Sequence, residues 1–229
     1  MRENFCVEAF IINNEMMNVT QLSDRVYEIP VDHVRVFILE DIPTESITLV
    51  DTGFDRTADE LVETLVSEFG DIDYVILTHD GPDHYGGLDQ VVDRFSPELI
   101  TAAEEETLLE AINQPIDRYM THGDVLFDAI EVIQIAGHSP CPSALLLRDE
   151  GELISSDILD GADRRGLPEG YLLPPPEIFN WDHAAAESGL DKLLEYDFET
   201  VYVFHGSHVL GDAKTKLDKF INFREHYRE

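Results

Sequence analysis

The stretch Thr78-His79-Asp80-Gly81-Pro82-Asp83-His84-Tyr85-Gly86-Gly87 carries the densest chemical signal in this sequence. It follows a short apolar run that predicts a buried strand over residues 74–77, and it precedes a helix predicted over residues 86–95. Two imidazoles and two carboxylates therefore fall between a strand end and a helix start. Zn²⁺ takes histidine nitrogen and aspartate oxygen in such clusters and keeps one position for water when the site is catalytic. An acidic turn with ordinary capping aspartates is the alternative interpretation.

Three further side chains that can bind a metal lie near the ends of predicted strands. They are His138 in Gly137-His138-Ser139-Pro140, Asp157 in Ser155-Ser156-Asp157, and His205 in Phe204-His205-Gly206. Each alone is an ordinary turn residue. Because strand ends at one edge of a sheet lie close together and carry function, their joint pattern predicts a shared site.

Hydrophobic periodicity predicts a mixed α/β (α+β) fold. Two similar halves indicate two sheets packed face to face with helices outside, a four-layer αββα sandwich. A doubly wound parallel sheet is the competitor, but an initial hairpin and the consecutive strands near residues 125–158 argue against it. Strands are predicted at 26–30, 34–40, 47–51, 74–77, 99–102, 125–135, 143–148, 152–158 and 201–204, and helices at 57–69, 86–95, 104–112, 182–194 and 213–223. The irregular stretch 159–180 is long enough to be a functional loop.

The charge of the chain excludes several classes of partner. It has 48 Asp plus Glu against 15 Lys plus Arg, a formal net charge of −33, and 43% hydrophobic residues, enough for a core. A surface this acidic repels phosphate backbones and anionic lipid, so we expect neither nucleic-acid nor membrane binding. Two cysteines, Cys6 and Cys141, and no recognisable signal peptide favour the cytoplasm.

The acidic residues are dispersed and lysine is rare, a composition typical of halophilic archaea. At ~1 M salt the Debye length is only about 3 Å, so neighbouring carboxylates barely repel one another. We therefore expect the protein to lose structure when salt is removed. Far-UV circular dichroism in molar and in millimolar KCl tests this, and identical spectra would contradict it.

The chain is predicted to form one domain over residues 19–229. Met17 is followed by Asn-Val-Thr and could be the natural start of translation. Residues 1–18 are accordingly predicted to be a flexible N-terminal extension.

Five motifs, taken in order, resemble those of the metallo-β-lactamase superfamily, here of a haloarchaeal type. The resemblance runs from about residue 26 to residue 211 and implies the αββα sandwich, with the site at one edge between the sheets. The motifs are Asp51-Thr52-Gly53, His79 to His84, Gly137-His138, Asp157, and His205-Gly206.

The resemblance also implies two metal sites. His79 and His138 would hold one ion, Asp83, His84 and His205 the other, and Asp157 would bridge them. This sequence departs from the family at Gly81, where a second ligand histidine is expected. Asp80, next to it, could complete the first site. The implied cofactor is therefore one firmly bound Zn²⁺ with a looser second ion.

The implied activity is hydrolysis of a small ester, thioester or lactone by a metal-bound hydroxide, since bound Zn²⁺ lowers the pKa of water to about 7. Asp83 and Asp157 are the expected catalytic residues. Asp51 would position a ligand histidine, with a plain turn residue as the alternative. Tyr85 could touch the substrate or simply pack. Arg164 and Arg165 could bind an anionic group of the small-molecule substrate or form surface salt bridges.

Two other functions stay open, the first of them because of Gly81. One is a degenerate, non-catalytic or sensory protein of the same fold. The other is an iron-dependent enzyme similar to the sulfur dioxygenases of this superfamily. The metal content separates these alternatives. The sequence leaves the substrate and the oligomeric state open.

Overall fold

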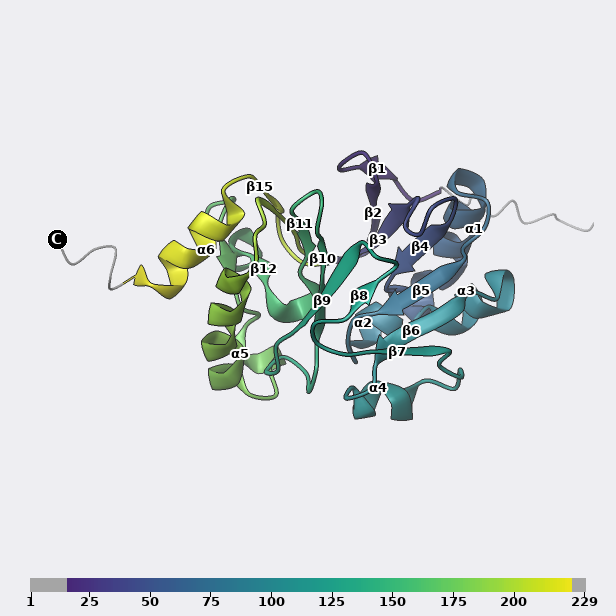
Figure 1. Ribbon diagram of the computed structural model, residues 1–229. Helices are drawn as coiled ribbons and strands as arrows, with labels where there is room; N and C mark the ends of the chain where they lie inside the picture. Colours follow the sequence, from purple (N-terminus) through teal and green to yellow (C-terminus); the bar gives the residue numbers. More distant parts are fainter. Residues whose placement is uncertain (1–15, 224–229) are drawn as a thin grey trace, which may run out of the picture.

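The computed structural model describes residues 16–223 of the chain, and its two main β-sheets lie between outer helices (Figure 1). The strands of the first sheet are β1 (Thr20–Gln21), β2 (Val26–Val31), β3 (Val34–Glu40), β4 (Ile47–Val50), β5 (Tyr74–Leu77), β6 (Glu98–Ala102) and β7 (Arg118–Met120), in this spatial order. Strands β1 to β4 pair antiparallel, and β4 to β7 pair parallel. The parallel edge requires helical crossovers, which bring polar turns to the carboxyl ends of β4 and β5.

The second sheet has the order β15-β14-β11-β10-β9-β8. Its strands are β8 (Val125–Leu126), β9 (Ile130–Gln134), β10 (Ser143–Leu147), β11 (Glu152–Ile154), β14 (Thr200–Tyr202) and β15 (Val209–Leu210). A separate small hairpin pairs β12 (Asp160–Gly161) with β13 (Leu172–Leu173). Within this sheet β11 and β14 are parallel, so the turns that follow them leave the sheet at the same edge.

Helices cover the outer face of each sheet. In Figure 1, α1 (Ala58–Glu68) and α3 (Leu88–Phe95) lie beside the first sheet, and α5 (His183–Gly189) and α6 (Ala213–Ile221) beside the second. The remaining short helices are α2 (Pro82–Tyr85) and α4 (Glu106–Ala111), with 3₁₀ turns η1 (Asp55–Thr57), η2 (Ser156–Ile158), η3 (Ala162–Arg165), η4 (Glu177–Phe179) and η5 (Leu190–Glu195). The predicted four-layer α/β arrangement is confirmed.

Two apolar clusters hold the layers together. The first fills the space between the sheets, where the rings of Phe37 and Phe204 meet edge to face with centroids 4.9 Å apart. The second lies under α6 and η5, where Leu153 and Val201 of the second sheet share a cluster with Leu217. Alternate residues of the second sheet thus point to different layers, as the two-residue period of a strand requires.

Several predicted boundaries are wrong, for local reasons. Residues 125–135 form a hairpin, because Phe127 and Asp128 adopt positive φ and reverse the chain between β8 and β9. The strand predicted over 152–158 ends at Ile154, and η2 follows it. The helix predicted over 182–194 is α5 followed by η5. The stretch 159–180 is built from β12, η3, β13 and η4, and β1, β7 and β15 were not predicted.

The N-terminal extension predicted for residues 1–18 lies mostly outside the described residues. Of its last three residues, Met17 packs against the first apolar cluster, and its backbone N–H donates to Thr64 Oγ1 at 3.0 Å. Within residues 16–223, no helix combines the length and the hydrophobicity that crossing a bilayer requires.

Candidate metal centre

Four chain turns meet at one edge of the molecule, between the two sheets. His79 follows β5, His138 lies between β9 and β10, and Asp157 and His205 come just after the parallel strands β11 and β14. The Ser143 N–H donates to the Thr78 carbonyl at 3.0 Å, which ties the start of β10 to the end of β5. The parallel pairing and this link explain why residues far apart in sequence converge here.

Besides the group of Asp51, His79 and His84, the converging side chains form two groups, each with its ligand atoms within 4.8 Å of one another. One group is His79, His138 and Asp157, and the other is Asp83, His84 and His205. The sequence motifs assigned His79 and His138 to one ion, Asp83, His84 and His205 to the other, and Asp157 to both.

Asp157 lies between the two groups. Its Oδ2 is 3.6 Å from His138 Nε2 and 3.5 Å from His205 Nε2. Its Oδ1 is 3.5 Å from His84 Nε2. One buried carboxylate therefore faces imidazoles of both groups, as a bridging ligand must.

The atoms that face the centre lack partners. Within residues 16–223, the Nε2 atoms of His79, His84 and His205 and Oδ1 of Asp157 are buried and accept or donate no hydrogen bond. Leaving a buried polar atom unsatisfied costs about 1–3 kcal/mol, so native structures rarely tolerate several together. Convergent nitrogen and carboxylate lone pairs are a donor set that fits a metal ion such as Zn²⁺.

The opposite ring nitrogens are held by acceptors. Nδ1 of His84 lies 2.7 Å from Asp51 Oδ2, and Nδ1 of His205 lies 3.0 Å from the His33 carbonyl. Nδ1 of His138 lies 3.1 Å from Asn180 Oδ1. Because carbonyl and carboxylate oxygens only accept, we assign a proton to each Nδ1, and Nε2 is the nitrogen that faces the centre and would bind a metal once it carries no proton of its own.

Asp51 supports two histidines of the centre, His84 and His79. It accepts from the Thr78 backbone N–H at 2.8 Å and from Thr78 Oγ1 at 2.7 Å, besides its contact with His84. The Thr78 hydroxyl gives its single hydrogen to Asp51, so it accepts from His79 Nδ1 at 3.1 Å. Asp51 thus positions His84 directly and His79 through Thr78, in the way that metal-ligating histidines are usually supported.

Burial and neighbouring charges set the protonation of the centre. Burial and the adjacent His84 imidazole hold the pKa of His79 well below its usual value. Burial opposes ionisation of Asp157, but the imidazoles of His84 and His205 bring its pKa well below the usual range. Burial would lower the pKa of His205, whereas Asp157 and Asp83 raise it to about 10. Asp157 is therefore a carboxylate at neutral pH, as a metal ligand must be.

Gly81 lies against both groups. A Cβ built there would come 2.8 Å from His79 Nε2 and 2.8 Å from His84 Cδ2. Both rings are fixed by their Nδ1 partners, so neither can turn away freely. The position thus lacks a ligand and also lacks room for a side chain in this arrangement.

We therefore expect Gly81→Ala to weaken metal binding by about 10–100-fold, the loss typical when ligand orientation is disturbed. Competition with a chromophoric chelator measures the affinity. Thermal unfolding of the chelated protein is the control, because it separates a folding defect from a metal defect. Unchanged affinity in the variant would contradict the crowding described for His79 and His84.

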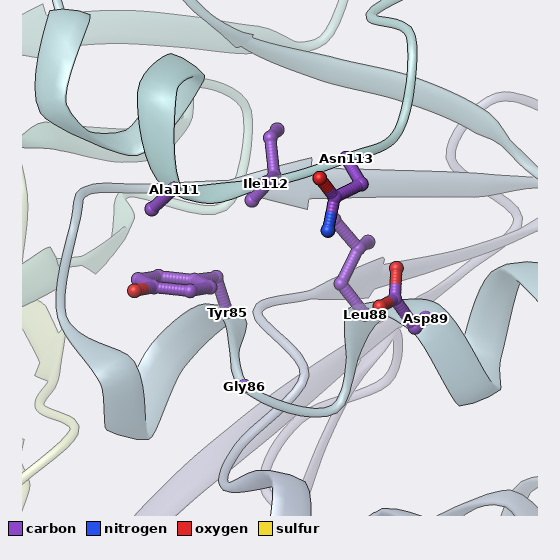
Figure 2. Close-up of a pocket in the computed structure, with 7 residues that line it drawn as sticks. All are labelled: Tyr85, Gly86, Leu88, Asp89, Ala111, Ile112 and Asn113. Atoms are coloured by element: carbon purple, nitrogen blue, oxygen red, sulfur yellow. The ribbon is translucent and has the colours of Figure 1, made fainter.

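Two residues proposed from the sequence lie apart from the two groups. Asp80 lines the cleft above the centre, but its carboxylate belongs to neither group among the described residues. Tyr85 lines a different, smaller cavity of about 70 Å³, with Leu88 and Ala111 (Figure 2). The geometry therefore gives no support to a contact between Tyr85 and a substrate in the cleft.

The cleft above the centre has a volume of about 510 Å³. Beyond side chains of the two groups, its walls include His33, Phe54, Arg164, Phe179 and Trp181. Arg165, in contrast, donates to the Pro174 carbonyl. Of these wall residues, the sequence indicated only Arg164.

The segment that carries Phe179 and Trp181 is bonded to the turn that carries His138. Trp181 N–H donates to the His138 carbonyl at 3.2 Å, and Asp182 N–H donates to the Gly137 carbonyl at 2.9 Å. We call residues 177–183 the wall segment. Asn180 in it holds the His138 ring, a role that no sequence pattern indicated, since the two residues are 42 positions apart.

Glu105 is a fully buried carboxyl behind the His138 turn. Its Oε1 accepts from the Ser139 hydroxyl and from the Cys141 backbone N–H. Burial raises the pKa of Glu105 to about 7 from its usual 4.5, although these two hydrogen bonds favour the charged form. Between these values the folded state holds a proton that the unfolded state releases, so this residue's contribution to stability falls as the pH rises towards 7.

We expect Glu105→Gln to leave stability nearly unchanged close to pH 5 and to raise it by about 2–3 kcal/mol at pH 8, because glutamine never ionises. Urea unfolding at the two pH values and fixed salt measures the difference. Glu104, its exposed neighbour, provides the matched control as Glu104→Gln. An equal effect of Glu105→Gln at both pH values would contradict the raised pKa.

Comparison with known proteins is consistent with this geometry. The family model of the metallo-beta-lactamase superfamily matches residues 29–205. The beta-lactamase-like protein 2 homolog of Caenorhabditis elegans is 26% identical over 186 residues, which are 77% of this chain and 57% of that protein. The chain thus spans little more than half the length of this relative.

Solved structures share the fold at low identity. A metallo-beta-lactamase from Pontibacter korlensis has a TM-score of 0.70 and 17% identity, covering 92% of this chain and 99% of that chain. A beta-lactamase domain protein from Burkholderia ambifaria has a TM-score of 0.69 and 18% identity, covering 91% of this chain and 77% of that chain. At such identities the likeness concerns the fold alone.

Proposed function

This chain belongs to the metallo-β-lactamase superfamily, and we propose that it is a metal-dependent hydrolase of a small ester, thioester or lactone. The observation that carries the proposal is the set of Nε2 and Oδ1 atoms that converge around Asp157 at the base of an open cleft, buried and without a hydrogen-bond partner among the described residues. Nitrogen and oxygen ligands in this combination favour zinc.

His79, His138 and Asp157 would hold one ion, and Asp83, His84, His205 and Asp157 the other. Bound Zn²⁺ supplies ionised water at neutral pH and polarises a carbonyl oxygen. The two groups differ in their number of protein ligands, because Gly81 contributes none to the first. We therefore propose one tightly bound and one looser ion.

The two carboxylates have different roles in this proposal. The Asp157 side chain is only 6% exposed and lies among three imidazoles, so it would serve as a ligand shared by both ions. The Asp83 side chain is 23% exposed and lines the cleft, with Oδ2 3.4 Å from His205 Nε2. From that place Asp83 can orient a water molecule toward a substrate carbonyl and accept its proton.

Elemental analysis of protein purified in high salt, followed by assays with an ester, a thioester and a lactone, tests the proposal. We expect near-stoichiometric zinc and turnover of one of the three classes. Iron without hydrolysis would favour the sulfur dioxygenase-like alternative. A metal-free, inactive protein would favour a degenerate or sensory one.

A pair of variants ties this result to the site. His205→Gln should remove metal and turnover, because Nε2 of His205 faces the centre. His208→Gln is the matched control, since His208 lies nearby but pairs with Glu28 at 2.9 Å. Equal metal loss in both variants would show that the assignment of His205 is wrong.

A further inference from the structure

The lining of the cleft above the candidate metal centre includes one arginine and an aromatic wall. The guanidinium of Arg164 and the rings of Phe54, Phe179 and Trp181 line the same space. Neither feature is required to hold a metal or to position water. Both are available to a molecule that enters the cleft.

Arg164 is held in place by a buried partner. Its Nη1 donates to Asp160 Oδ2 at 2.7 Å, and Asp160 is fully buried while the Arg164 side chain is 23% exposed. A guanidinium has five N–H donors in a planar fork, and this ion pair engages one of its nitrogens. The pair fixes the fork at the wall of the cleft and reduces the entropy lost when the fork binds a ligand.

The charge of the chain makes this placement informative. With a net charge of −33, the protein repels anions over most of its surface. A half-buried arginine is screened by salt less than an exposed one, so it still attracts an anion at high ionic strength. The neighbouring Arg165 is bonded instead to the Pro174 carbonyl. The two adjacent arginines therefore have different surroundings.

The aromatic wall adjoins the arginine. Cζ of Arg164 lies 5.2 Å from the centroid of the Phe179 ring, within the range of a cation–π contact. Phe179 is 54% exposed and Trp181 is 66% exposed. Large aromatic side chains exposed at the mouth of a cleft are typical of a site for an apolar ligand group.

From these placements we propose that the cleft selects amphipathic carboxylates. A carboxylate of the substrate binds the Arg164 fork, and an apolar or aryl group lies against Phe54, Phe179 and Trp181. This assignment of Arg164 as a specificity-determining residue rests on the proposed hydrolase function, and it narrows the substrate to an ester, thioester or lactone that carries both groups.

Trp181 allows the binding step to be measured without turnover, because it is the one tryptophan in the sequence. Zinc-loaded protein is titrated with 4-phenylbutyrate and with its neutral isostere 4-phenylbutyramide, at fixed KCl concentration, while Trp181 fluorescence is recorded. We expect the carboxylate to bind about tenfold more tightly or better, the gain from a charge-assisted hydrogen bond.

Arg164→Met should remove the preference for the carboxylate, and Arg165→Met, the matched control, should retain it. Because Arg164→Met leaves buried Asp160 without its partner, the double variant Arg164→Met/Asp160→Asn provides a second version with no unpaired charge. A preference that persists in both Arg164 variants would overturn the proposal and indicate that the carboxylate binds elsewhere, for example at the metal. Equal binding of the two ligands by the native protein would also overturn it.

The titration also separates this inference from the proposed function. Carboxylate selection without hydrolysis of any ester, thioester or lactone would leave Arg164 as an anion site and refute the hydrolase. Hydrolysis without carboxylate selection would support the hydrolase and refute the role of Arg164.

Discussion

Replacing Asp157 by asparagine should lower turnover by about 10²–10⁴-fold, more than the 10–100-fold loss typical of an outer-shell partner. The Asp157 oxygens lie 3.5–3.6 Å from Nε2 atoms of three histidines that belong to both groups. Asparagine removes the negative charge between them and turns an N–H₂ group toward one of them. Both proposed metal sites would therefore lose a ligand at once.

Metal content and kcat, measured on the same preparations of Asp157→Asn, check this expectation. Asp163→Asn is a suitable control, because Asp163 lies nearby in the chain but its carboxylate accepts hydrogen bonds from the backbone N–H and the hydroxyl of Ser207. If Asp157→Asn retained native zinc content and native turnover, Asp157 would not be a shared ligand.

Replacing Asp51 by alanine should damage both the fold and the metal centre. Asp51 is fully buried and accepts hydrogen bonds from the Thr78 N–H, the Thr78 hydroxyl and His84 Nδ1. Each buried donor left unpaired costs about 1–3 kcal/mol, so we expect a loss of about 3–5 kcal/mol in the free energy of unfolding. That is a large fraction of the ~5–15 kcal/mol stability of an ordinary domain.

The variant Asp51→Asn distinguishes orientation from folding. Asparagine keeps the shape and an acceptor for Thr78, but it presents N–H₂ to His84 and favours the tautomer with the proton on Nε2. We expect a smaller loss of stability than in Asp51→Ala, with metal affinity still reduced by about 10–100-fold. Urea unfolding and chelator competition measure the two quantities. Native metal affinity in Asp51→Asn would contradict the positioning role.

The sequence predicted the layers of the fold because they depend on local patterns. Alternating and continuous apolar runs located β2, β3 and β5 almost to the residue. The reversal at Phe127 and Asp128 was missed, since its positive φ values carry no glycine signal. The two-residue strands β1, β8 and β15 are stabilised by pairing with neighbours, which a local pattern does not contain.

The candidate metal centre shows the same difference between features that a local pattern predicts and features that depend on distant residues. His79, Asp83 and His84 stand in one short motif, and His138, Asp157 and His205 were found from strand ends and family motifs together. The residues that orient them were mostly not predicted. Asn180 and the His33 carbonyl contact ligand histidines 42 and 172 positions away, and an ordinary asparagine or a backbone oxygen leaves no mark in a single sequence.

The backbone hydrogen bonds between the wall segment and the His138 turn limit how the cleft can be re-engineered. A library randomised at Phe179 and Trp181 to accept bulkier compounds would also disturb His138, because the backbone of Trp181 is hydrogen-bonded to the backbone of His138. If the proposed function is correct, screening such a library for activity would select for metal retention as strongly as for the new compound. Compensating changes at Asn180 or Asp182 would have to be sampled in the same round.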